Sequence, residues 1–223
     1  MYLPPAFRED RTERLQQLMR EHPLATLVTL GRDGLIASHI PLVYEPVPES
    51  PGRLHGHLAR ANPQWGNMPA GSEALAIFHG PQAYISPSWY ATKRQTGRVV
   101  PTWNYAAVHA YGTVETYTDA SRLRRHVASL TAIHEENFSA PWSLEDAPEP
   151  YIAGMLSAIV GIEITITRLE GKWKMSQNRP AEDRAGIVQG LVSKGGAERC
   201  AIAQLVRDYE PEEATPPRRS EQS

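Results

Sequence analysis

Apolar and polar residues alternate along several short segments of the chain, which is the pattern of half-buried β-strands. Four such segments lie in the first third of the sequence, at residues 25–30, 35–44, 54–59 and 73–78. Segments rich in glycine, proline and charged residues separate them, for example Gly31-Arg32-Asp33-Gly34. Because no helical pattern lies between these strands, antiparallel hairpins are the simplest way to pair them.

Two further strands are predicted in the second half of the chain. Residues 105–117 alternate between small apolar and polar side chains, and residues 162–167 alternate isoleucine with Glu163, Thr165 and Thr167. The following Leu169-Glu170-Gly171 is typical of a turn, and a second run passes through Trp173 and Met175. We therefore expect a hairpin at residues 162–175.

Helical spacing of apolar residues appears in four places. It occurs at residues 10–21, after the cap residue Asp119 with a stripe through Leu123, Val127, Leu130 and Ile133, and at residues 181–192 and 197–209. These patterns predict a mainly β (α+β) fold, an antiparallel barrel with peripheral helices, as one domain over residues 1–210. The polar segment 211–223 is expected to be a disordered tail.

Composition and charge exclude several classes of protein. The 223 residues carry a formal net charge of -2, so no overall positive field attracts nucleic acid or a membrane surface. The single cysteine, Cys200, cannot form an internal disulfide bond. We find neither a secretory signal nor an apolar run long enough to span a bilayer, so we expect a cytoplasmic protein.

Most common catalytic and metal-binding patterns are missing. The sequence has no G-x-G-x-x-G or P-loop, and its serines are not in a G-x-S-x-G motif, which argues against a hydrolase. His55 and His57 share one strand face, with His39 and His79 as the available partners for a metal. Because no cysteine or carboxylate has ligand spacing with them, we expect polar histidines rather than a metal site.

Two regions carry candidate binding chemistry. Arg60 and Asn62 follow a strand, where an arginine fork can bind a phosphate, although this motif taken alone is better explained as a hairpin end with Asn62 capping a short helix. Residues 80–90 and 100–105 concentrate aromatic, hydroxyl and amide side chains, which suits a planar heteroaromatic ligand. The alternative is that Trp89 and Trp103 are core or dimer-interface anchors.

Five segments together resemble the PaiB family, the FMN-binding negative transcriptional regulators. They are Ala37-Ser38-His39-Ile40-Pro41-Leu42, residues 56–65, residues 80–90, residues 100–105 and Lys174-Met175-Ser176-Gln177-Asn178. The resemblance runs from Met1 to about Leu191. It implies an FMN-binding split-barrel fold and a homodimer with flavin at the subunit interface.

The resemblance also implies roles for individual residues. Ser38 and His39 would approach the flavin, and its phosphate would be surrounded by His57, Arg60 and Asn62. The ring and ribityl chain would be lined by Ser86, Trp89, Tyr90, Thr102, Trp103 and Asn104. Lys174 and Gln177 match the family motif without an assigned contact.

The family name implies repression of transcription, but the sequence shows no clear DNA-binding motif. Residues 181–209 could mimic a helix-turn-helix, but the charges of the second helix favour a packing pair. We therefore expect repression to act through a regulatory protein partner or through the state of the flavin, with direct DNA binding as the alternative. Two rivals remain: an FMN-dependent oxidoreductase, such as a flavin reductase or a pyridoxamine-phosphate-oxidase-like enzyme, and a haem binder with His39 or His57 as ligand.

Overall fold

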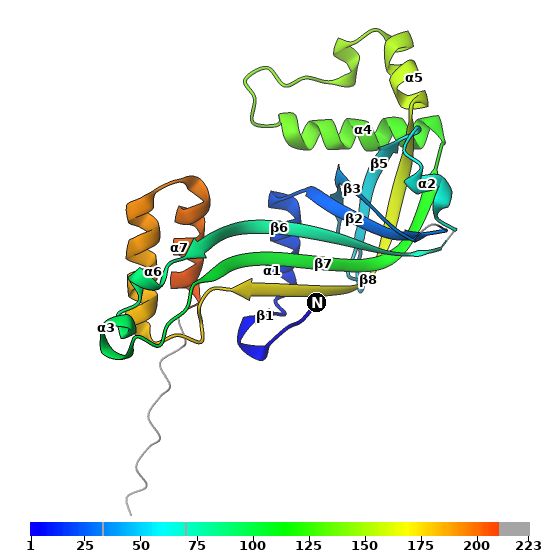
Figure 1. Cartoon of the computed structure of the whole chain (residues 1–223). Helices are drawn as coiled ribbons and strands as arrows, with labels where there is room; N and C mark the ends of the chain where they lie inside the picture. The colour runs from blue at the N-terminus through cyan, green and yellow to red at the C-terminus, as the bar shows by residue number, and fades with distance from the viewer. Residues whose placement is uncertain (33, 70, 210–223) are drawn as a thin grey trace, which may run out of the picture. The chain divides into compact units, whose positions relative to one another are not determined.

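The computed structural model describes residues 1–32, 34–69 and 71–209. Their strands form one eight-stranded sheet in the order β3-β2-β6-β7-β8-β5-β4, and β1 pairs with β8 (Figure 1). Within the described residues, no strand pairing joins β3 to β4, so the sheet is open. This confirms the predicted mainly β fold, an antiparallel sheet accompanied by helices. The tail predicted at residues 211–223 lies outside the described residues.

The eight strands have clear bounds and antiparallel registers. They are β1 (Arg8–Glu9), β2 (Leu24–Gly31), β3 (Gly34–Pro41), β4 (Val43–Glu45), β5 (Arg53–Ala59), β6 (Glu73–Ile85), β7 (Thr102–Tyr117) and β8 (Ile159–Lys174). Strand β2 pairs with β3 and β6, and β5 pairs with β4 and β8. The strand predicted at residues 35–44 is divided at Leu42, because Pro41 has no N–H for the ladder and Leu42 N–H donates to the Pro23 carbonyl at 2.8 Å.

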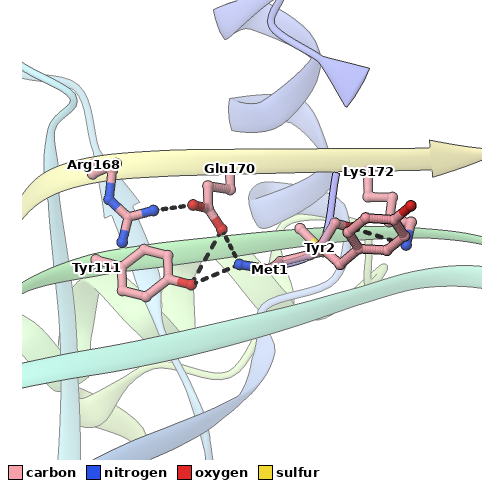
Figure 2. Close-up of polar contacts among 6 residues, drawn as sticks. All are labelled: Met1, Tyr2, Tyr111, Arg168, Glu170 and Lys172. Carbon is pink, nitrogen blue, oxygen red and sulfur yellow. Dashed lines mark hydrogen bonds and ion pairs between the residues drawn. The ribbon is translucent and has the colours of Figure 1, made fainter. Parts of the chain in front are cut away.

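The hairpin predicted at residues 162–175 is wrong, because β8 runs straight through Gly171. A tight turn needs a positive φ, and Gly171 is not among the glycines that have one. Figure 2 shows Arg168, Glu170 and Lys172 projecting in turn from this continuous strand. The Glu170 carboxylate accepts from the Met1 amino group at 2.5 Å and from the Tyr111 hydroxyl at 3.1 Å. Glu170, which the sequence placed in a turn, therefore lies within β8, where hydrogen bonds from Met1 and Tyr111 hold its carboxylate.

The predicted helices are confirmed, and shorter ones join them. The helices are α1 (Thr12–Glu21), α2 (Gln64–Asn67), α3 (Thr92–Thr96), α4 (Ala120–Glu135), α5 (Glu149–Ser157), α6 (Ala181–Lys194) and α7 (Ala197–Asp208), with single 3₁₀ turns η1 (Pro5–Phe7), η2 (Pro87–Trp89) and η3 (Leu144–Asp146). Asp119 caps α4 as expected, accepting from the Arg122 N–H at 2.7 Å. Helix α4 buries Leu123 and His126, whereas Ile133 of the predicted stripe is exposed.

The chain divides into two compact units. The first consists of Met1, Glu9–Gly80 and Ala107–Gly171, and the second of Tyr2–Arg8, Pro81–Ala106 and the described part of Lys172–Ser223. Strands β6, β7 and β8 contribute residues to both. The core of the second unit includes Ile85 and Met175 with Ile187 and Leu191 of α6 and Ile202 of α7. This unit carries most of the aromatic residues predicted to bind a ligand.

Candidate functional site

A cavity of about 640 Å³ lies in the second unit, where α6 and α7 stand beside the end of β6 (Figure 1). We call it the aromatic cavity. Its walls are mostly apolar and come from β6, η2, β7 and the turn between α6 and α7. The lining residues are Gln82, Ala83, Tyr84, Ser86, Trp89, Trp103, Lys194, Gly196, Ala197, Glu198 and Arg199. Three predicted ligand contacts, Ser86, Trp89 and Trp103, are therefore brought together from two separate motifs.

The aromatic walls are partly open to solvent. Trp103 is 52% exposed and Tyr84 is 49% exposed, and their rings meet edge to face with centroids 6.1 Å apart. Two aromatic rings that are open to solvent in the wall of one cavity are available to contact a planar ligand. Ser86 caps η2 through its hydroxyl, which accepts from the Ser88 N–H at 3.2 Å. The cavity thus offers ring faces with a hydroxyl beside them.

Trp89 is held in place by two glycines of α6. A Cβ on Gly190 would lie 2.3 Å from the Trp89 ring, and a Cβ on Gly186 would lie 2.0 Å from the Trp89 carbonyl oxygen. Only glycine allows η2 to approach the helix this closely. The position of Trp89 in the cavity wall therefore depends on a small-residue face of α6.

Two buried polar atoms beside the cavity residues have no partner. They are the Tyr90 hydroxyl and Asn104 Nδ2, which follow Trp89 and Trp103 directly in the chain. Asn104 Oδ1 is satisfied by the Ser176 hydroxyl at 3.0 Å. Burial raises the pKa of the Tyr90 hydroxyl despite the nearby Arg179, so it stays protonated at neutral pH. Neither residue lines the aromatic cavity, and Asn104 points to the opposite face of β7 from Trp103.

The family motif at residues 174–178 meets the start of β7. The Lys174 ammonium donates to the Thr102 hydroxyl, while burial and the neighbouring Lys172 charge lower the pKa of Lys174. Gln177 folds back on its own strand end, accepting from the Met175 N–H at 2.7 Å and donating to the Trp173 carbonyl at 2.6 Å. Thr102 and Lys174 are thus partners, and Gln177 shapes the backbone.

The other predicted residues belong to the first unit, and several have partners of their own. Asn62 Nδ2 donates to the Ser38 hydroxyl at 3.0 Å, and Asn62 Oδ1 accepts from the Gln64 N–H at the start of α2. His39 is exposed and bonds Thr26 across the β2–β3 pair at 3.0 Å. The structure therefore places Ser38 and Asn62 in contact, and Asn62 also supports the short helix.

Arg60 makes structural contacts at the end of α5. Its Nε donates to the Ser157 carbonyl at 2.6 Å and its Nη2 to the Ile159 carbonyl at 3.1 Å. A guanidinium at a helix C-terminus satisfies carbonyls that lack a helical partner. Arg60 is exposed, so the role in phosphate binding that the resemblance implies stays a prediction.

His57 forms a pair with His126 of α4. The two nitrogens, Nδ1 of His57 and Nε2 of His126, lie 3.0 Å apart. Burial is the main reason that the pKa of His126 falls to about 4, and burial also lowers the pKa of His57. Among the described residues, no group of three or more potential ligands could hold a metal ion.

Sequence reasoning missed part of the aromatic cavity. Lys194, Glu198 and Arg199 were read as a turn and the start of a packing helix, but they form its polar wall. Glu198 is tied down, because its carboxylate accepts from the Gln82 N–H at 2.8 Å. The glycine pair at residues 195–196 was the available signal, since it sharply turns the chain between α6 and α7.

The chain matches a known family over most of its length. Residues 1–168 match the family described as "Putative FMN-binding domain". The chain is 30% identical to the protease synthase and sporulation protein PAI 2 of Bacillus subtilis, and the match covers 93% of this chain and 97% of that protein. The chain belongs to the PaiB family. An uncharacterized protein of Emericella nidulans, AN0679, is 38% identical over 93% of this chain and 97% of its own length. FMN is the cofactor of this family and is assigned to the chain on that basis.

Solved structures of other proteins resemble the fold of this PaiB family member. A FAD- and haem-binding protein of Mycobacterium smegmatis superposes with a TM-score of 0.57 at 16% identity, over 85% of this chain and 80% of that one. The flavocytochrome Anf3 of Azotobacter vinelandii gives a TM-score of 0.55 at 12% identity, over 82% and 78%. At such identities the likeness shows the split-barrel-like fold alone. No described helix is long and apolar enough to cross a membrane.

Proposed function

We propose that the chain binds FMN with the isoalloxazine ring in the aromatic cavity of the second unit. The observation that carries this is the convergence of Ser86, Trp89 and Trp103 on one cavity of about 640 Å³, a size usual for cofactor sites. Lys194 and Arg199 in the same wall are a second candidate for holding the phosphate, in place of the Arg60 group that the resemblance implies.

Each residue of the cavity has a defined task in this proposal. Trp103 and Tyr84 cover the ring and exclude water from it, and Ser86 offers a hydroxyl to the ribityl chain. When bound, the flavin supplies hydride or single-electron transfer that no side chain of the protein can provide. The family's contacts at Ser38, His39, His57, Arg60 and Asn62 stay predictions.

The biological role proposed for the flavin protein is PaiB-type negative regulation of transcription in the cytoplasm, acting through flavin state or a protein partner. Direct DNA reading has little support. Arg122 is paired with Glu163, and Arg124 with Glu149, so the basic cluster of α4 is largely neutralised. Helices α6 and α7 bury Ile187 and Ile202 against the core, as expected of a packing pair.

A homodimer belongs to the same proposal. Tyr84, Val100 and Trp103 are side chains of the second unit that are about half exposed or more, and large exposed aromatics are common interface anchors. A second copy would cover this surface.

A flavin-dependent oxidoreductase is the second candidate. The half-exposed Trp103 and Tyr84 leave a route by which a reactant could reach a ring bound in the cavity. Turnover of reduced nicotinamide by the flavin-loaded protein would favour this candidate. The haem alternative is separated from both by the visible absorption spectrum, since haem and flavin absorb differently.

We expect Trp103→Ala to weaken FMN binding by up to about tenfold, because an aromatic contact contributes about 0.5–1.5 kcal/mol beyond area burial. The matched control is Trp142→Ala, which removes a tryptophan of similar exposure from the first unit. Titration of apoprotein with FMN, followed by flavin fluorescence, measures each affinity. Equal affinities in the wild type and in Trp103→Ala would place the ring elsewhere.

We expect the isolated protein to bind DNA weakly and without discrimination. Its net charge is -2, and paired arginines leave few phosphate contacts. Fluorescence anisotropy at about 0.15 M salt should give similar affinities for promoter and random fragments, with oxidised or reduced flavin. A preference of about 10³ or more, usual for specific binders, would restore direct repression.

A further inference from the structure

A second hollow lies along the outer side of the α6–α7 pair, apart from the aromatic cavity. We call it the α6–α7 groove, and its volume is about 610 Å³. Its floor is mostly apolar and follows one stripe of α6, with a single contribution from α7. The lining residues are Arg184, Ala185, Val188, Gln189, Val192, Ser193 and Arg207. None of them is acidic, so the groove carries two positive charges and no negative one.

Arg184 is a buried cation that has no counter-ion among the described residues. The residue is only 6% exposed, and its Nη1 donates to the Tyr209 carbonyl at 3.3 Å. Its Nε is buried and has no hydrogen-bond partner. Among the described residues no carboxylate forms an ion pair with it. A buried charge is costly unless it is paired.

The nearest acid in sequence is committed elsewhere. The Asp183 carboxylate is fully buried and accepts from the Thr92 N–H at 2.9 Å and from the Thr92 hydroxyl at 2.8 Å. It fastens α3 to α6, so this carboxylate is not available to compensate the Arg184 charge. Among the described residues, the side chain of Arg207, the second cation of the groove, donates a hydrogen bond only to the Gln204 amide oxygen, at 3.4 Å.

We propose that the α6–α7 groove binds a small amphipathic carboxylate. The carboxylate would accept from the guanidinium groups of Arg184 and Arg207, which suit planar oxyanions. The hydrocarbon part would lie on Ala185, Val188 and Val192, of which Val192 is 49% exposed. None of the seven lining residues also lines the aromatic cavity, so the groove is separate from the proposed FMN site.

Calorimetry of the full chain with three probes tests the proposal. Octanoate carries both features, octanamide lacks the charge, and acetate lacks the hydrocarbon. We expect octanoate to bind one to one with a Kd of about 1 mM or tighter, the range open to a ligand of this size. Octanamide and acetate should bind at least about tenfold more weakly. Octanamide cannot form the ion pairs with the two arginines, and acetate cannot contact the apolar floor.

Variants assign the binding to the groove. Arg184→Met and Arg207→Met should each weaken octanoate binding about tenfold or more, since each removes a charge-assisted hydrogen bond. Arg94→Met is the matched control, because it removes an exposed guanidinium of α3 that lines neither the groove nor the aromatic cavity. If Arg184→Met fails to fold, Arg207→Met decides alone. The proposal is overturned by non-saturable octanoate binding, by equal binding of octanamide, or by unchanged affinity in Arg207→Met.

Discussion

Acidification from about pH 6.5 to about pH 4 should remove about 3 kcal/mol from the free energy of unfolding, through the buried His57–His126 pair. His126 is 8% exposed, and burial with the nearby His57 and His55 holds its pKa at about 4 in the folded protein. The unfolded chain takes up the proton first, near the ordinary pKa of 6.5. In that window the unfolded state binds more protons than the native state, so stability falls as pH falls and is fully present above about pH 6.5.

Urea titrations between about pH 6.5 and about pH 5 measure about half of this loss, before most carboxylates protonate. His126→Gln keeps an N–H that can donate to His57 and removes one titrating imidazole, so its stability should depend less on pH. The control His134→Gln removes an exposed imidazole from the same helix and should retain the wild-type loss. Parallel losses in the wild type and in His126→Gln would show that the pair is not the source.

Gly186→Ala should destabilise the protein by about 1–2 kcal/mol, although alanine is the better helix former by about 1 kcal/mol. The sign follows from the added Cβ, which would lie 2.0 Å from the Trp89 carbonyl oxygen, so backbone must move. Moving η2 also shifts Trp89 in the aromatic cavity. We therefore expect weaker FMN binding together with the lower stability.

Gly154→Ala is the matched control for this substitution. Gly154 also lies in a helix interior, but nothing lies within 4 Å of an added Cβ. It should gain up to about 1 kcal/mol from helix propensity alone. Thermal unfolding and FMN titration of the two variants separate packing from propensity. A stabilised Gly186→Ala protein with normal FMN affinity would contradict the dependence of Trp89 on α6.

The sequence by itself determined the fold class and the family. Period-two alternation identified the strands because half-buried strands must place apolar side chains on one face, and apolar spacing identified α1, α6 and α7. The same local signals failed where a tertiary partner decided the outcome. Glu170 was read as part of a turn, but Met1 and Tyr111 hold its carboxylate on a straight strand.

Only the tertiary structure decided which candidate residues meet. Trp89 and Trp103 share a cavity because α6 glycines let η2 approach, whereas the partners of Arg60 and His57 lie about 70 or more residues further along the chain. Burial also decided their electrostatics, since desolvation depends on neighbours that no local pattern contains. For this reason the sequence indicated the aromatic ligand site in outline, while the buried histidine pair and the unpaired Arg184 became visible only in the folded chain.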